Sequence, residues 1–245
     1  MGSSLQSNRD WVIWQDGADQ GGTMGIYAYN VHTGETHEVD PPRHSLEGLG
    51  RIVLAENYVV WTDPGEQKSK EVMYTYHLPS KKKETLARGD VYVLSERNGK
   101  VLYRTKHHLI LYDPQRHSKK RWNVPKEAAE IFLLNEHQVL FTTETKANTA
   151  LLWLYDLTTK AKTKFPIMVS TKELMIDGDD QVSILDDDAP ILHRFKITSH
   201  MKLQHKKMKS DGEEILQQNN LFLQLKVDSK FKEQQLIVSK KDYVK

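Results

Sequence analysis

Acidic side chains recur at a fixed interval along this sequence, and they have the clearest potential for chemistry. Each follows a short apolar run and precedes a polar turn. The set is Glu56, Glu96, Glu136 and Asp177, and the first three members are 40 residues apart. Carboxylates brought to one place could hold Ca²⁺ or another hard cation through their oxygen atoms. The alternative is that they are solvated turn residues, because turns favour polar side chains of this kind.

A second group of candidate residues falls in the predicted connections between repeated units. It consists of Arg43, His44, Arg88, Asp90, Lys126 and Lys172. Loops gathered at one face of a rigid scaffold often form its binding surface, and this mostly basic group would suit an acidic ligand or partner. The alternative is that these loops are polar only because they contact water. We take the group as a predicted binding site.

Other motifs that could carry catalysis are weak or missing. The run Asp186 to Asp188 lacks the glycine and distal glutamate of an EF-hand loop, which favours a tight acidic hairpin. His107 and His108 are adjacent in a predicted strand, so they point to opposite faces and cannot share one metal ion. The sequence contains no HExxH, GxSxG or glycine-rich phosphate motif. The basic segment 202–209 lacks interleaved aromatic residues, which favours a solvated outer strand over a membrane or nucleic-acid surface.

The elements that must position these residues repeat with a period near 40. First apolar runs contain Leu54, Leu94, Leu134, Ile176 and Leu216, at steps of 40, 40, 42 and 40 residues. Each run is followed by a polar turn, two further apolar runs and a lysine-rich stretch. A fixed period of this length with several short strands is typical of a β-propeller. The predicted units are 5–40, 51–86, 91–124, 130–167, 173–205 and 213–245.

We therefore predict an all-β fold, a six-bladed β-propeller of four-stranded antiparallel blades, with residues 5–245 as a single domain. Apolar inner strands fit a sheet that is packed on both faces, and lysine on the outer strand protects an exposed edge. Seven blades, with one short or missing, is the alternative count. Residues 1–4 read as a leader added for expression, and residues 5–8 as the end of a first strand.

Composition limits the classes of partner and chemistry. The 245 residues suit one domain of the larger all-β kind, and no apolar run approaches the roughly 20 residues that cross a bilayer. The net charge of +2, from 35 basic and 33 acidic residues, is too balanced to indicate nucleic acid as the main partner. With no cysteine, disulfides, thiolate catalysis and zinc–thiolate sites are excluded. This usage fits either the cytoplasm or an oxidising envelope compartment.

The run Val59 to Trp61, preceded by an apolar strand and a polar turn, is followed by a Tyr-x-Tyr-x-Leu-x-x-x-x-Lys pattern. Together they resemble the TolB-like six-bladed propellers of bacteria. The best matches are VMYTYHL at residues 72–78 and LLWLYDL at residues 151–157. The Ser-Pro-Asp-Gly turn usual in that group is absent. The sequence is also similar to small propeller domains of Gram-positive envelope lipoproteins. The resemblance implies a scaffold that binds proteins or small ligands, and it transfers no catalytic residue.

Two functions follow as hypotheses. The favoured one is a non-enzymatic, monomeric scaffold that binds a protein or cell-envelope component at the funnel mouth, without a cofactor and without nucleic acid. The alternative is a metal-dependent hydrolase or lactonase with a cation such as Ca²⁺ on the propeller axis. An extracytoplasmic location is favoured over the cytoplasm. Membrane association is expected only through an N-terminal anchor upstream of the present start.

Overall fold

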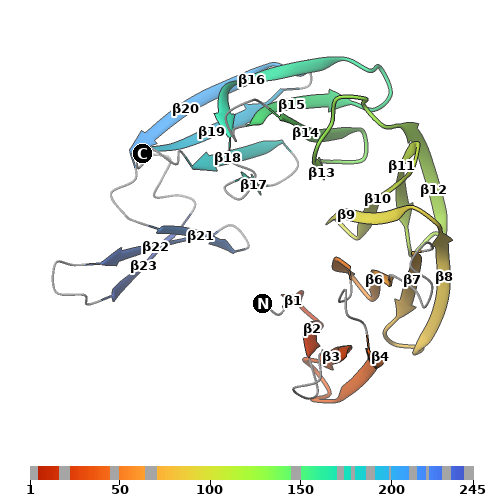
Figure 1. Cartoon of the computed structure of the whole chain (residues 1–245). Coiled ribbons are helices and arrows are strands. Elements are labelled where there is room, and N and C mark those ends of the chain that lie inside the picture. Colours follow the sequence, from red (N-terminus) through yellow and green to blue (C-terminus); the bar gives the residue numbers. More distant parts are fainter. Residues whose placement is uncertain are drawn as a thin grey trace. The chain divides into compact units, whose positions relative to one another are not determined.

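The computed structural model is built from antiparallel β-strands (Figure 1). It describes residues 5–16, 23–44, 50–63, 71–144, 150–169, 174–177, 180–185, 191–198, 200–209, 214–218, 221–227 and 233–239, with no side chain described beyond Lys207. None of the described residues forms a helix that could cross a membrane. The chain divides into two compact units, residues 1–136 and 137–245, which are described separately.

The first unit contains three four-stranded sheets whose strands follow one another in the chain. The first sheet is β1 (Gln6–Ser7), β2 (Trp11–Asp16), β3 (Thr23–Asn30) and β4 (Thr36–His44). The second is β5 (Ile52–Ala55), β6 (Tyr58–Asp63), β7 (Val72–His77) and β8 (Lys82–Arg88). The third is β9 (Val91–Arg97), β10 (Lys100–Thr105), β11 (His108–Asp113) and β12 (Ser118–Asn123), and β13 (Ile131–Leu133) follows it.

Strands of the second unit continue the same up-and-down order. β13 is followed in its sheet by β14 (Gln138–Glu144), β15 (Ala150–Asp156) and β16 (Lys162–Val169). The next sheet is β17 (Leu174–Asp177), β18 (Gln181–Leu185), β19 (Ile191–Ile197) and β20 (Leu203–Lys209). The last described strands are β21 (Glu214–Gln218), β22 (Leu221–Val227) and β23 (Glu233–Ser239). The described residues thus form five four-stranded sheets and one three-stranded sheet.

The turns of the repeat have a shared backbone geometry. Four outer strands are preceded by a residue with left-handed backbone. This residue lies two positions before the strand at Gly34 and Lys160, with φ of 73° and 62°. It lies directly before the strand at Lys81 and His117, with φ of 56° and 49°. Asn98 and Gly99, with φ of 51° and 73°, form the two-residue turn between β9 and β10. An Asn-Gly pair with two positive φ values matches the twist of a tight hairpin. These short turns hold consecutive strands antiparallel, as the sequence predicts.

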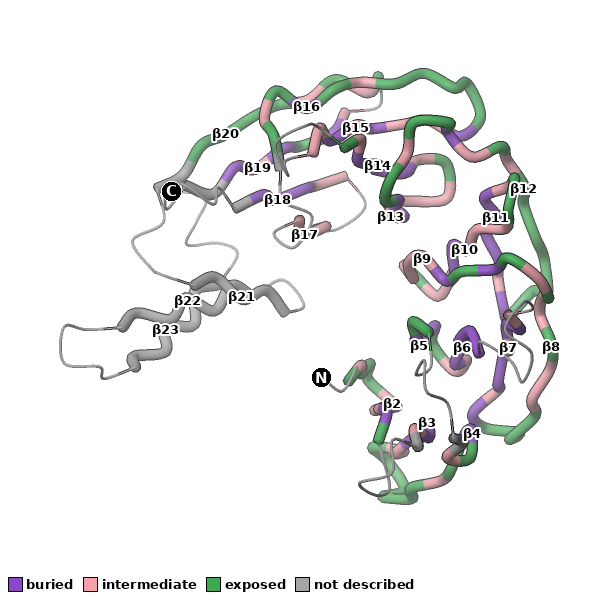
Figure 2. The backbone as a smooth tube through the Cα atoms, viewed as in Figure 1, coloured by how far each residue is buried: buried purple, intermediate pink, exposed green. Residues whose placement is uncertain are grey.

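Alternate residues of the second sheet are buried on opposite faces, as expected for an inner strand of a propeller. Ile52, Leu54, Val59 and Trp61 belong to an apolar cluster shared with the first sheet. Val53, Ala55 and Val60 belong to a second cluster shared with β9 to β11. Figure 2 shows that burial is concentrated on the inner strands, while the outer strands are largely exposed. Within this unit the sheets therefore stack face to face through side chains of successive inner strands.

Candidate functional site

Two of the four predicted metal ligands, Glu56 and Glu96, converge on Gly99. Glu56 lies in the turn between β5 and β6, and its Oε2 accepts a hydrogen bond from Gln115 Nε2. A Cβ atom on Gly99 would lie 2.9 Å from Glu56 Oε1. Glu96 Oε1 accepts a hydrogen bond of 2.9 Å from the Gly99 backbone N–H. Burial raises the pKa of the Glu96 carboxyl, and the nearby charge of Glu56 acts in the same direction.

Glu136, the third predicted ligand, is occupied by two lysines. Its carboxylate accepts hydrogen bonds from Lys100 Nζ and, at 3.2 Å, from Lys120 Nζ. These two bonds lower the pKa of Glu136 to about 2. The side chain of Asp177 lies outside the described residues. In the described part of the chain, no three His, Cys, Asp or Glu side chains form a group that could hold a metal ion. The cation site stays a prediction.

The predicted loop residues that can be placed form a surface of mixed charge. Arg88, Asp90 and Lys126 are exposed. Between Arg88 and Asp90, the Gly89 N–H donates to the backbone oxygen of Glu71 at 2.9 Å. Burial raises the pKa of the Glu71 carboxyl, and the charge of Asp90 adds to this effect. The side chains of Arg43 and His44, and all of Lys172, lie outside the described residues.

A cavity of about 340 Å³ lies on the other set of turns, between the first two sheets. It is bounded by the β1–β2, β3–β4, β5–β6 and β7–β8 connections, whose residues are far apart in the sequence. We call it the turn cavity. Its lining residues are Asp10, Trp11, Asn30, His32, Thr33, Glu35, His37, Asn57, Leu78, Pro79 and Lys81. Sequence reasoning did not single out this site, because each residue alone resembles an ordinary strand or turn residue.

The indole of Trp11 forms one wall of the turn cavity and is fixed by polar contacts. The side chain is 6% exposed. Its Nε1–H donates to Asn57 Oδ1 at 3.0 Å, which ties the first sheet to the β5–β6 turn. The Trp11 backbone N–H donates to Asn8 Oδ1 at 2.9 Å. A buried, hydrogen-bonded indole loses little conformational freedom on contact with a ligand, so it is suited to act as a rigid apolar contact surface.

His37 lies between two aromatic rings at the back of the turn cavity. Its ring meets Trp11 edge to face at a centroid distance of 5.7 Å, and it lies 6.1 Å from the Tyr76 ring. Burial lowers the pKa of His37, the Lys81 charge lowers it further, and the Glu35 charge opposes both effects. The imidazole is therefore neutral at neutral pH and takes part in the apolar packing of this wall.

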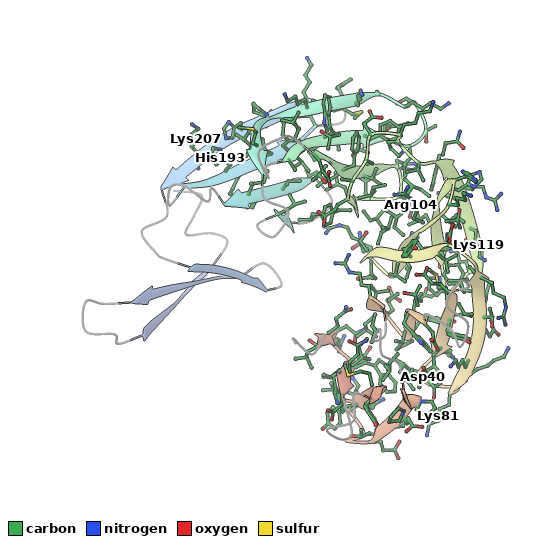
Figure 3. All side chains as sticks on the ribbon, in the orientation of Figure 1. Asp40, Lys81, Arg104, Lys119, His193 and Lys207 are labelled. Carbon is green, nitrogen blue, oxygen red and sulfur yellow. The ribbon has the colours of Figure 1, made fainter. Side chains whose placement is uncertain are left out.

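The rim of the turn cavity carries charged groups in two arrangements. Asp10 Oδ1 and His32 Nε2 are 2.7 Å apart and satisfy each other. Lys81 is exposed on the turn between β7 and β8 (Figure 3). The hydroxyl in the lining is that of Thr33, whose oxygen accepts a hydrogen bond from the Glu35 N–H at 3.3 Å. This arrangement offers an apolar wall with a cation at its edge.

Comparisons with known proteins bear on the fold. No protein-family model and no curated protein matches the sequence. An uncharacterised protein from Listeria monocytogenes is similar in structure, with 12% identity, 94% of this chain and 82% of that chain covered, and a TM-score of 0.58. The β-propeller domain of the Trilobed protease from Pyrococcus furiosus has 7% identity, 98% and 96% coverage, and a TM-score of 0.54.

TolB from Acinetobacter baumannii is also similar, with 12% identity, 82% of this chain covered and a TM-score of 0.51. The chain spans about half the length of TolB, of which it covers 52%. The protein has a TolB-like β-propeller fold. The predicted all-β architecture of four-stranded antiparallel sheets is thereby confirmed.

Proposed function

We propose that this protein is a non-catalytic, six-bladed β-propeller that binds another protein through the turn cavity. Six sheets among the described residues support the blade number. The observation that carries the binding role is the cavity itself, about 340 Å³ in volume and bounded by Trp11, Leu78 and Pro79. Cavities of this size and lining accept small molecules or the anchoring side chain of a partner.

The chemistry of the turn cavity favours a peptide segment with an apolar side chain beside an acidic one. The apolar side chain would pack on Trp11 and Pro79. Its acidic neighbour would meet Lys81, the cation of the rim, while the Asp10 carboxylate is hydrogen-bonded to His32. A charge-assisted contact of this kind contributes about tenfold in affinity. The expected location of the partner, in the cell envelope, rests on the family resemblance alone.

Selection from a random peptide library, followed by calorimetry on the recovered peptides, tests the proposal. We expect enrichment of apolar–acidic sequences and a loss of affinity of about tenfold in Lys81→Glu. Lys126→Glu is the matched control, since Lys126 is an exposed lysine at the predicted funnel mouth. Affinity that falls in Lys126→Glu and in Arg88→Glu but not in Lys81→Glu would move the binding site to that mouth.

The alternative, a metal-dependent hydrolase, depends on a cation held by Glu56, Glu96 and Asp177. Ca²⁺ and Zn²⁺ titrations followed by thermal unfolding separate it from the binding role. We expect no rise in the melting temperature, because Glu136 is paired with two lysines and Glu56 accepts a hydrogen bond from Gln115. A cation-dependent rise that disappears in Glu56→Gln would support the hydrolase.

A further inference from the structure

The outer strands β16 and β20 of the second unit carry a dense set of exposed lysines. Neither strand contains an acidic residue. Lys162 of β16 is exposed, and its ammonium lies 5.0 Å from the centre of the Trp153 ring. The other exposed lysines on these strands and on the turns leading into them are Lys160, Lys164, Lys202, Lys206 and Lys207. We call these five lysines the basic edge. Figure 3 marks Lys207 at this edge, with His193 beside it on β19.

Three lysines on the outer strands of the first unit form ion pairs with carboxylates. Lys83 lies 2.5 Å from Asp40, Lys82 lies 2.6 Å from Glu84, and Lys120 lies 3.2 Å from Glu136. Within the described ranges, none of the five basic-edge lysines forms an ion pair with a carboxylate. Protection of a strand edge needs only a few charges. Among the residues that the structure describes, the basic edge therefore has more charge without a carboxylate partner than edge protection requires.

The two strands of the basic edge belong to sheets that touch. The ring of Phe165 on β16 meets that of Phe195 on β19 edge to face, with centroids 4.9 Å apart. Phe195 is paired in register with His205 on β20. In Figure 1, β16 and β20 run along the same outer side of this unit. The lysines of both strands therefore lie at the outer edges of neighbouring sheets, where the adjacent Lys206 and Lys207 point to opposite faces of β20.

Apolar side chains accompany the lysines on β16. Met168 is 62% exposed, and Pro166 is exposed as well. Phe165, between Lys164 and Pro166, is fully buried, whereas Lys164, Pro166 and Met168 are all exposed along a stretch of β16 that pairs irregularly with β15. An exposed methionine beside several cations matches the boundary between lipid headgroups and acyl chains, where apolar and basic side chains are both stabilised.

We propose that the basic edge, together with Met168, is a docking surface for an anionic phospholipid membrane. Its cations are lysines, which act as point charges and suit a fluid array of phosphates. Single-stranded nucleic acid is disfavoured because Phe165 and Phe195 are buried and cannot stack on bases, and the exposed ring of His205 is already stacked on Phe195. A protein partner is disfavoured because lysine is depleted from the centres of protein interfaces. This inference does not depend on the turn cavity.

Sedimentation of the whole protein with vesicles tests the proposal. The vesicles are phosphatidylcholine alone or an equal mixture of phosphatidylcholine and phosphatidylglycerol, at low and at physiological ionic strength. We expect binding to the mixed vesicles only, weakening as salt rises. The triple variant Lys202→Glu, Lys206→Glu, Lys207→Glu should lower the partition coefficient by about 100-fold. Met168→Ser should lower it by about threefold, through lost apolar contact.

The control triple is Arg88→Glu, Lys106→Glu, Lys126→Glu, which makes the same change in net charge on exposed residues of the first unit. It should retain partition within about twofold of the native protein. Circular dichroism checks the fold, and the corresponding lysine-to-glutamine triple replaces the basic-edge variant if that variant does not fold. Equal binding to both vesicle types, an equal loss in the control, or tighter binding to DNA than to mixed vesicles would overturn the proposal.

Discussion

Lys83 and Asp40 form an ion pair that joins the first two sheets of the propeller. The Lys83 Nζ atom, on β8, lies 2.5 Å from Asp40 Oδ1, on β4. The Asp40 side chain is 1% exposed and that of Lys83 is 29% exposed. The same ammonium group lies 4.1 Å from the centre of the Tyr74 ring and 5.0 Å from that of Trp61. Lys83 thus turns inward across the sheet instead of protecting the edge.

Replacing Asp40 with alanine should destabilise the fold strongly. The substitution would leave the Lys83 ammonium largely buried without its carboxylate, and breaking such a pair from one side costs about 3 kcal/mol. The free energy of unfolding in urea measures the effect. A double variant, Asp40→Ala with Lys83→Met, should recover part of the loss because no uncompensated charge then remains.

The pair formed by Lys82 and Glu84 provides the matched control. Its two side chains are 71% and 39% exposed, although the atoms lie 2.6 Å apart. Exposed ion pairs are screened by solvent and contribute little, so Glu84→Ala should change the free energy of unfolding little. Similar losses in Glu84→Ala and Asp40→Ala would show that the position of Asp40 between the sheets has no special importance.

Gly99 should tolerate alanine less well than Gly34. Both glycines have φ of 73°, so the backbone strain of an L-residue, about 1 kcal/mol, is common to both. At Gly34 the nearest atom to an added Cβ is 4.0 Å away, whereas at Gly99 the Glu56 carboxylate is 2.9 Å away. Moving Glu56 would disturb its hydrogen bond from Gln115. Thermal unfolding of Gly34→Ala and Gly99→Ala compares the two, and equal losses would contradict the close approach of Glu56.

Acid should weaken the contact between the first two sheets through His37. The pKa of His37 is lowered in the folded protein, mainly by burial. Below the ordinary value near 6.5 the unfolded chain therefore binds a proton more readily than the folded one, and stability falls as the pH falls. In the described part of the chain, the buried Nε2 atom of His37 has no hydrogen-bond partner. Protonation would thus add an unsatisfied charge to the wall formed with Trp11.

The variant His37→Phe should separate this effect from general acid unfolding. Phenylalanine keeps ring contacts with Trp11 and Tyr76 and does not titrate. We expect its melting temperature to fall less than that of the native protein between about pH 7.5 and about pH 5.5. His107→Gln, at an exposed loop position, is the control, and its melting temperature should fall as much as that of the native protein. A fall in His37→Phe equal to the native one would assign the acid sensitivity to other groups.

The strand order and most turns of this fold could be predicted from the sequence because they depend on local patterns. The repeat near 40 residues predicted the apolar strands, and the polar turn predicted after each first apolar run is found at Asn98-Gly99 in the third unit. The left-handed backbone at Lys81, His117 and Lys160 was harder to predict, because none of these residues is a glycine. Here the conformation is imposed by the hairpin and not by the residue type.

The candidate sites were harder to predict because they depend on contacts between sheets. Glu56 directly follows β5, Glu96 lies within β9, and Glu136 lies three residues after the end of β13. Equal spacing in the sequence therefore does not give these carboxylates equivalent positions. The turn cavity likewise combines Trp11 with Lys81, from different sheets. No periodic pattern along one strand could reveal either arrangement.

Glu136 should titrate far below an ordinary glutamate. Hydrogen bonds from Lys100 and Lys120 lower its pKa to about 2, from a value near 4.5. The stabilisation from this pair is present above the unfolded value and is lost as the pH falls towards about 2. Carbon-13 NMR of the side-chain carboxyl would follow the titration. Lys100→Met and Lys120→Met should each raise the midpoint, and both together should restore an ordinary value. An ordinary midpoint in the native protein would mean that the two lysines do not hold Glu136 in solution.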